Sequence, residues 1–289
     1  RVIPTNRLLG FGYAGLKERV KEMAKQIDGA KRMLFAGIDA GSRTVKLVVV
    51  DGNGLRIVSS GIKDQGIRQS DLAESLLQDV LKKANIPRGD VARIVATGYG
   101  RNAIEFADTT ITEITCHACG VHHWIPEAGT VVDIGGQDSK VMRLEPDGRV
   151  RDFDMNDRCA AGTGRFLEVV ASRLQVGLND LGEMAGKAEK ASAISSMCVV
   201  FAETEIIGLM ASGETPDNIV AGVQMSITSR IASMAGRNIA EPVVFTGGVA
   251  LIPGMDKALA LAINRKITVC PEPQYTGALG AAILASRAV

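Results

Sequence analysis

Two segments of the chain repeat one pattern, and this repeat constrains the fold more than any other feature. Residues 34–51 and 130–144 each form an apolar strand that ends in an aspartate, then a turn of small residues, then a second strand. The aspartates are Asp39 and Asp133. The two units begin about 95 residues apart, a spacing typical of a duplicated small domain. A chain of 289 residues is therefore predicted to form two related α/β domains.

The remaining pattern alternates helices with strands, as α/β domains do. A third strand follows each repeat, at 55–61 and 150–155, and further strands are predicted at 91–97, 110–114, 242–246 and 266–269. Helices are predicted at 13–32, 69–84, 116–124, 164–174, 178–186, 198–211, 216–238, 254–264 and 277–286.

Composition excludes several classes of function. The formal net charge of +1 gives no basic field for nucleic acid, and no apolar run approaches the roughly 20 residues of a membrane span. Five cysteines without a secretory signal do not indicate a disulfide framework. We therefore expect a cytoplasmic protein with reduced thiols and with neither nucleic acid nor a membrane as partner.

The small-residue turns favour a nucleotide held between the two domains. Such turns direct backbone N–H groups at phosphates, and an acid at a strand end can hold a metal-bound water or orient an attacking water. The chain contains no G-x-x-x-x-G-K-[ST] motif and no G-x-G-x-x-G after a strand. A P-loop or a dinucleotide-binding fold is therefore not supported.

Two cysteines stand where an extended segment meets a helix. Cys159 precedes a turn punctuated by Gly162 and Gly164, and Cys198 precedes the apolar run that starts at Val199. The start of a helix leaves N–H groups unpaired and stabilises an anion, including a thiolate. Such thiols can be metal ligands, and the alternative is that both are ordinary buried cysteines.

Several motifs, in order, resemble one known family. Ile38-Asp39-Ala40-Gly41-Ser42, Val132-Asp133-Ile134-Gly135-Gly136 and Phe245-Thr246-Gly247-Gly248-Val249-Ala250 resemble the two phosphate loops and the adenosine loop of the acetate/sugar kinase, heat-shock ATPase and actin superfamily. The stretch from Asn156 to Phe166, together with Cys198, is similar to one branch of it. That branch contains the activators of 2-hydroxyacyl-CoA dehydratases and the ATPase subunits of benzoyl-CoA reductases. The resemblance covers about residues 34–289.

The resemblance implies a fold and a division into domains. The fold is a two-domain actin-like (ribonuclease H-like) ATPase, α/β in class, with duplicated ββ-hairpin units and the nucleotide in the cleft between the domains. Residues 34–129, together with a C-terminal helix at 275–289, are expected to form domain I, and residues 130–274 domain II with the cysteines. Residues 1–33 are an unmatched, basic, helical extension.

The resemblance also implies an activity. Members hydrolyse ATP with Mg²⁺ and pass one low-potential electron to a CoA-ester-processing enzyme of anaerobic metabolism. A dimer shares one [4Fe–4S] cluster, to which Cys159 and Cys198 of each protomer are the expected ligands, since such a cluster takes four thiolates. The implied partners are a second protomer, identical or a paralogue, the catalytic components of an iron–sulfur dehydratase or reductase, and a donor such as ferredoxin or flavodoxin.

Site residues follow from the matched motifs. Asp39, Asp133 and Gln137 are the expected catalytic residues. Nucleotide binding is expected from Gly41, Ser42, Thr44, Lys46, Gly135, Gly136, Asp138, Gly162, Gly164, Gly247 and Gly248. The alternatives are that the aspartates only cap turns, that Lys46 lies on a solvent face, and that Gly247-Gly248 is a plain turn.

Some alternatives stay open. Cys116 and Cys119 have zinc-ligand spacing, with His122 and His123 nearby, but they lie at the start of a predicted helix. Glu203 and Glu205 have no assigned role. Within the family, a dehydratase activator competes with an ATPase component of a benzoyl-CoA reductase. Outside it, a small-molecule kinase or an actin-like scaffold is compatible with the fold, because a fold does not establish function.

Overall fold

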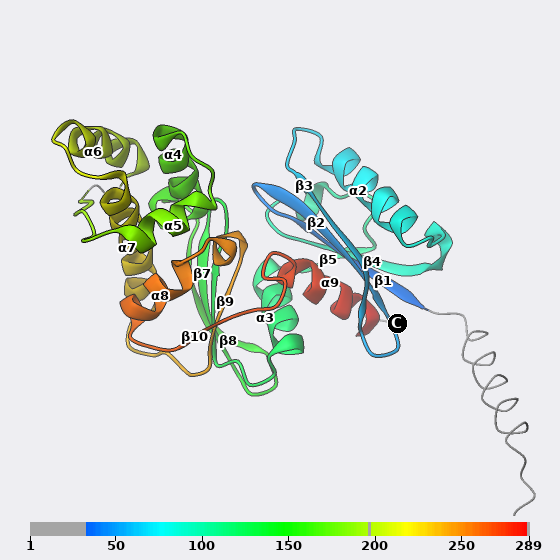
Figure 1. The fold of residues 1–289 in the computed structure, drawn as a ribbon. Helices are drawn as coiled ribbons and strands as arrows, with labels where there is room; N and C mark the ends of the chain where they lie inside the picture. Colours follow the sequence, from blue (N-terminus) through cyan, green and yellow to red (C-terminus); the bar gives the residue numbers. More distant parts are fainter. Residues whose placement is uncertain (1–32, 196–197, 288–289) are drawn as a thin grey trace, which may run out of the picture.

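The computed structural model describes residues 33–195 and 198–287. The predicted helix at 13–32 lies outside these residues. The described part contains two five-stranded sheets, and Figure 1 shows them in two lobes with helices between and around them.

The first sheet has the strand order β3-β2-β1-β4-β5. Its first three strands are antiparallel, and β4 and β5 continue parallel to β1. Its strands are β1 (Leu34–Ala40), β2 (Thr44–Asp51), β3 (Ile57–Asp64), β4 (Val91–Thr97) and β5 (Thr109–Thr110).

The second sheet repeats the first strand for strand, in the order β10-β9-β6-β7-β8. Here β6, β7 and β8 are antiparallel, and β9 and β10 continue parallel to β6. Its strands are β6 (Thr130–Ile134), β7 (Ser139–Leu144), β8 (Val150–Asn156), β9 (Val243–Thr246) and β10 (Ile267–Val269). This duplicated topology is the one that the repeat predicted, and it agrees with the actin-like fold that the resemblance implied.

Helices cover the faces of both sheets. The α-helices are α2 (Gln69–Lys83), α3 (Glu113–Trp124), α4 (Gly164–Leu174), α5 (Asp180–Lys187), α6 (Val199–Ala211), α7 (Pro216–Ala235), α8 (Met255–Ile263) and α9 (Thr276–Arg287). Because both faces of the central strands are covered, β1 is buried along its whole length and reads as a continuous apolar run rather than an alternating one.

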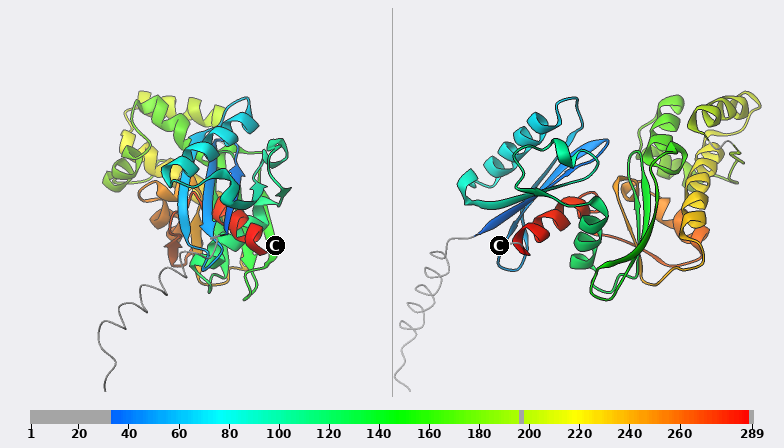
Figure 2. Two further views of the ribbon diagram at one scale, coloured as in Figure 1. Left: turned by 90° about the vertical axis from the view of Figure 1, so that its right-hand side faces the viewer. Right: turned by 180° about the vertical axis from the view of Figure 1, so that it is seen from behind.

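Three helices pack against the first sheet, and two of them, α3 and α9, connect it to the second. The apolar side of α2 packs on one face of the first sheet, and α9, the last helix of the chain, packs on the other face. Helix α3 leads from the first sheet to the second and contacts α9 closely. Figures 1 and 2 show α3 and α9 side by side between the lobes.

Glycines allow this close helix crossing. A Cβ atom added to Gly280 of α9 would lie 1.8 Å from the carbonyl oxygen of Cys116, and one added to Gly120 of α3 would lie 2.0 Å from that of Thr276. Only glycine lets two helix backbones approach so closely. The crossing brings the start of α9 against the strand ends that carry Asp39 and Asp133.

One predicted element is wrong. The strand predicted at 110–114 is only the two-residue β5, because α3 begins at Glu113. The hydroxyl of Thr112 caps this helix by accepting a hydrogen bond from the backbone N–H of Thr115, a capping signal that the apolar pattern concealed. Other predicted boundaries agree within a few residues.

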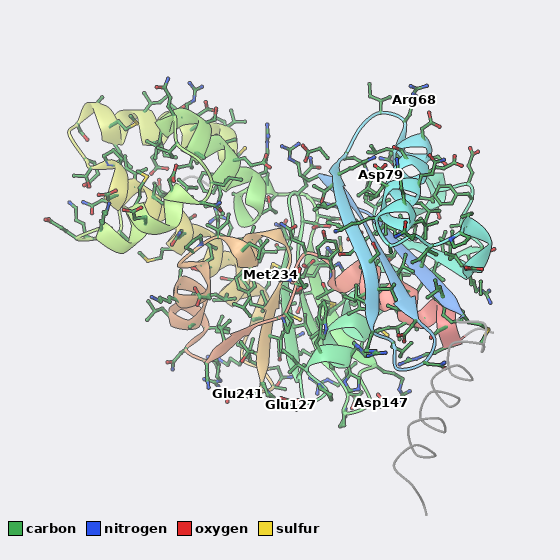
Figure 3. The ribbon with its side chains drawn as sticks, turned by 45° about the vertical axis from the view of Figure 1, so that its right-hand side comes forward. Arg68, Asp79, Glu127, Asp147, Met234 and Glu241 are labelled. Atoms are coloured by element: carbon green, nitrogen blue, oxygen red, sulfur yellow. The ribbon has the colours of Figure 1, made fainter. Side chains whose placement is uncertain are left out.

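The two ends of the second sheet differ in character. Glu127, Asp147 and Glu241 lie in the loops at the end where β6 begins, on the outside of the molecule (Figure 3). The opposite end of β6 carries Asp133 and faces the first sheet. In the described part of the chain, no helix has the length and apolar character to cross a membrane.

Candidate functional site: a cleft lined by the two repeats

A cavity of about 300 Å³ lies between the two sheets, a volume within the range of small-molecule sites. Both repeats line it at the ends of their first strands, with Asp39 from one and Asp133 from the other. The turns that follow these aspartates form much of the wall. Residues far apart in the sequence thus meet here because the two sheets present equivalent edges to one another.

Each aspartate is paired with a lysine on the neighbouring strand. In the first sheet Asp39 lies opposite Lys46, and the Nζ of Lys46 is 3.3 Å from Oδ2 of Asp39. In the second sheet Asp133 lies opposite Lys140, and the corresponding distance is 3.2 Å. The duplication therefore includes an ion pair between the same two strand positions of each repeat. Lys46 lines the cavity, and 17% of its side chain is exposed.

The second pair is more deeply buried and has more partners. Nζ of Lys140 also lies 2.9 Å from Oδ2 of Asp138 and 3.7 Å from Oε1 of Glu113 on α3, and only 2% of its side chain is exposed. Burial by itself lowers the pKa of Lys140, but the three carboxylates outweigh it and the pKa is raised. Lys140 is therefore a permanent cation that holds three acids together.

The acids respond differently to this environment. Burial raises the pKa of Glu113, and the attraction of Lys140 offsets this only in part. Burial also works to raise the pKa of Asp133, but the charges of His117 and Lys140 outweigh it and hold the pKa below its usual value. Asp133 is thus an anion at neutral pH. Its Oδ1 is buried and has no hydrogen-bond partner among the described residues.

His117 is buried and lines the cavity. It lies on α3, and its Nδ1 is 3.0 Å from the hydroxyl of Thr276 and 3.9 Å from Oδ1 of Asp133. The hydroxyl of Thr276 is in turn 2.9 Å from that of Thr246, which donates to the carbonyl of Pro273. This chain of contacts links the helix crossing to the ends of β6 and β9.

Two glycines make room for the aspartates. Gly98 follows β4 with a φ of +87°, and a Cβ there would lie 2.5 Å from Oδ1 of Asp39. Gly247 follows β9 with a φ of +88°, and a Cβ there would lie 2.6 Å from Oδ1 of Asp133. Both the backbone conformation and the close approach exclude other residues. The two glycines are equivalent positions of the duplication.

Most of the predicted site residues line one cavity. Besides the two aspartates, these are Gly41, Ser42, Thr44, Lys46, Gly135, Gly136, Asp138, Gly164, Gly247 and Gly248. Gln137 and Gly162 are not among the lining residues; Gln137 is exposed and Gly162 is buried next to Asn156. The individual roles of these residues stay predictions.

The two predicted cluster cysteines lie outside the cavity, at helix starts in the second lobe. Cys159 precedes the short 3-10 turn Ala160–Gly162 that leads into α4, and Asn156 fixes its backbone through hydrogen bonds of 2.7 and 3.0 Å. Cys198 is the residue immediately before α6 and is exposed. Within residues 33–195 and 198–287 no cysteine forms a disulfide, and no group of three or more His, Cys, Asp or Glu side chains is arranged to hold a metal ion.

The residues whose roles the sequence left open, Glu203, Glu205 and Cys116, do not line the cavity. Glu203 forms an ion pair with Arg173 of α4, and Glu205 accepts hydrogen bonds from the backbone N–H and hydroxyl of Ser195; neither glutamate lines the cavity. Burial raises the pKa of the Cys116 thiol to about 12, which keeps it protonated.

Sequence reasoning missed several residues of the site, and three of them, Lys140, Gly98 and His117, show why. Lys140 stands at the same distance after Asp133 as Lys46 does after Asp39, so the repeat itself contained the signal. Gly98 follows its strand as Gly247 follows β9, which is a second repeated signal. For His117 no local pattern existed, because its neighbours come from different elements of the fold.

Comparison with known proteins identifies the family of this chain. The model of the BadF/BadG/BcrA/BcrD ATPase family matches residues 36–285. The chain is 44% identical over 253 residues to the (R)-2-hydroxyglutaryl-CoA dehydratase activating ATPase of Acidaminococcus fermentans, covering 87% of this chain and 96% of that protein. It is 33% identical to one subunit of the benzoyl-CoA reductase of Thauera aromatica, over 86% of this chain and 92% of that protein.

A solved structure shows the same similarity in three dimensions. The activator of the 2-hydroxyisocaproyl-CoA dehydratase from Clostridium difficile with bound ADPNP superimposes with a TM-score of 0.84 at 41% identity, covering 89% of this chain and 95% of that one. The family model matches most of the chain, and the relatives match over nearly their whole length, so the chain belongs to the BadF/BadG/BcrA/BcrD ATPase family.

Proposed function

We propose that this protein is the ATP-hydrolysing activator of a 2-hydroxyacyl-CoA dehydratase and that it donates one low-potential electron through a [4Fe–4S] cluster shared by two protomers. The identity of 44% to an activating ATPase, against 33% to a component of a benzoyl-CoA reductase, favours the activator over the reductase. The kinase and scaffold alternatives have no observation in their favour.

Support for ATP hydrolysis comes from the cleft. The small residues of the two turns leave room for phosphate groups, and Lys46 and Lys140 place positive charge at the strand ends. Oδ1 of Asp133 is an anionic, buried oxygen without a hydrogen-bond partner among the described residues, and such oxygens are the ligands that Mg²⁺ prefers. Asp39 and Asp133 would hold the hydrated ion, and the residues 34–129 with 275–289 and 130–274 would close on the nucleotide as two domains.

The single observation that carries the cluster proposal is the setting of Cys198. This thiol is exposed, and the first turn of α6 exposes 67% of Val200 and 69% of Phe201. Large apolar side chains beside an exposed thiol indicate a surface that another protein covers. Figure 1 shows α6 at the outer edge of the second lobe.

Two protomers would supply four thiolates. Neither Cys159 nor Cys198 belongs to a C-x-x-C pair, so one chain offers two ligands of the four that a cubane cluster takes. The cluster, when bound, supplies a one-electron carrier of low potential. The chain's part is to place both thiols at helix starts, where unpaired N–H groups stabilise negative charge. The electron donor would be a ferredoxin or flavodoxin in the cytoplasm.

The test is iron and acid-labile sulfide content of anaerobically purified protein, with the variants Cys159→Ser and Cys198→Ser. We expect about four irons per dimer in the wild type, and their loss in either variant. Cys119→Ser is the matched control, since Cys119 lies on α3 away from both helix starts and should retain the iron. Iron-free protein from strictly anaerobic cells, with unchanged ATPase activity in all variants, would refute the proposal.

A second measurement tests the interface. Phe201→Glu places a charge in the apolar surface of α6 and should convert the dimer to a monomer in light scattering. Leu261→Glu changes a similarly exposed apolar residue on α8 and should leave the dimer intact.

A further inference from the structure

One ion pair connects the two lobes across the mouth of the cleft. Arg43 lies in the turn between β1 and β2 of the first sheet, and its Nε donates to Oε1 of Glu168 on α4 at 2.8 Å. The side chain of Glu168 is only 20% exposed. Both residues line the cavity, so the pair stands beside the space proposed for the nucleotide.

Helix α4 is attached to the turn of the second repeat as well. The backbone N–H of Gly164 donates to the carbonyl of Gly135 at 2.9 Å, and that of Arg165 donates to the carbonyl of Gly136 at 2.8 Å. A Cβ on Gly136 would lie 2.8 Å from Cβ of Arg43, so the two turns are in contact. The start of α4 is therefore attached to the second turn directly and to the first turn through the ion pair of Glu168 with Arg43.

The charged residues of α4 extend this connection to α6. Arg165 donates to the second oxygen of Glu168 at 2.9 Å, and Arg173, at the other end of α4, forms an ion pair with Glu203 of α6. Cys159 precedes α4 and Cys198 precedes α6. A row of charged contacts along α4 thus connects the first turn of the cleft with the helices that follow both cysteines.

We propose that Glu168 is a positioning residue that couples the nucleotide state of the cleft to helices α4 and α6 through its ion pair with Arg43. This inference deepens the proposed function and rests on it for the importance of the two cysteines. A bound phosphate group adds negative charge beside Arg43 and competes with Glu168 for the guanidinium. Gain or loss of the terminal phosphate then changes how firmly α4 is held to the first lobe.

The geometry assigns opposite roles to the two arginines around Glu168. Arg43 belongs to the other lobe and can separate from Glu168 when the cleft moves. Arg165 belongs to the same helix, at the i−3 position, and moves together with Glu168. Removal of Arg43 or of Glu168 should therefore weaken the coupling, whereas removal of Arg165 should not.

The experiment is hydrogen–deuterium exchange of the full-length protein with ADP and with a non-hydrolysable ATP analogue. In the wild type we expect the exchange of residues 164–174 and 199–211 to differ between the two nucleotides. Glu168→Gln should reduce that difference at least threefold, and Arg43→Gln should do the same from the other lobe. Arg165→Gln is the matched control and should keep the difference. Nucleotide affinity is measured in parallel, and all samples are compared at saturation.

Two outcomes would overturn the coupling. One is a Glu168→Gln variant in which the exchange of α4 and α6 differs between the two nucleotides as much as it does in the wild type. The other is a loosening of α4 that is equal with both nucleotides, which would show a merely structural contact. Iron content of the same samples reports on the proposed function separately: iron-free protein with a nucleotide difference that depends on Glu168 would refute the cluster and leave the coupling supported.

Discussion

The buried cation of the second repeat gives the sharpest prediction about stability. Lys140→Met removes the ammonium group that holds Asp133, Asp138 and Glu113 together, at distances of 3.2, 2.9 and 3.7 Å. With 2% of the lysine side chain exposed, solvent does not replace the lost partner. Breaking a buried ion pair from one side costs roughly 3–5 kcal/mol, because the remaining charge stays buried.

The equivalent pair of the first repeat provides the internal comparison. Lys46 has Asp39 as its described partner, at 3.3 Å, and 17% of its side chain is exposed. Lys46→Met should therefore cost about 1 kcal/mol. The assay is thermal unfolding without nucleotide, where 1 kcal/mol corresponds to about 2–4 °C for a chain of this size. We expect a fall on the order of 10 °C for Lys140→Met, and of a few degrees for Lys46→Met.

Two further measurements separate electrostatics from packing. In Lys140→Met the buried carboxylates lose their cation, so their pKa values rise above those of the unfolded chain and the loss of stability should shrink as the pH falls toward about 5. Adding Asp138→Asn removes one of the unpaired charges and should restore part of the stability. Equal costs for the two lysine variants, independent of pH, would refute the argument that burial and partner number set the difference.

The remaining predictions concern the same cleft and the helix crossing. Burial raises the pKa of Glu113 above its value in the unfolded chain, so the ionised form of Glu113 destabilises the folded state. Glu113→Gln should therefore raise the melting temperature at about pH 8, and this gain should disappear below about pH 4.5. Gly280→Ala should destabilise by about 3 kcal/mol, since the new methyl would lie 1.8 Å from a carbonyl oxygen, whereas Gly186→Ala, with no atom within 4 Å, should be neutral or stabilising in urea titrations. Asp133→Asn should lower kcat for ATP at least about a hundredfold; near-normal turnover would remove Asp133 from the mechanism.

Much of the fold could be predicted from local pattern alone. The repeated strand–aspartate–turn unit, the β-rich run from Val45 to Asp51 and the apolar periods of α4 and α6 are properties of neighbouring residues. The same holds for the candidate site: Asp39 and Asp133 are recognisable because each ends an apolar strand. The family resemblance added the expected roles of Cys159 and Cys198, which no spacing rule contains.

Other features depended on tertiary packing, which brings together segments that are far apart in the sequence. That α9 returns to the first sheet, that His117 stands between Thr276 and Asp133, and that Arg43 reaches Glu168 over 125 positions of sequence are consequences of packing. Lys140 illustrates the division: its place in the repeat was present in the sequence, but its burial and its three partners were not. Periodicity records only neighbours a few residues apart, whereas burial and ion pairing are set by elements that meet only after the chain has folded.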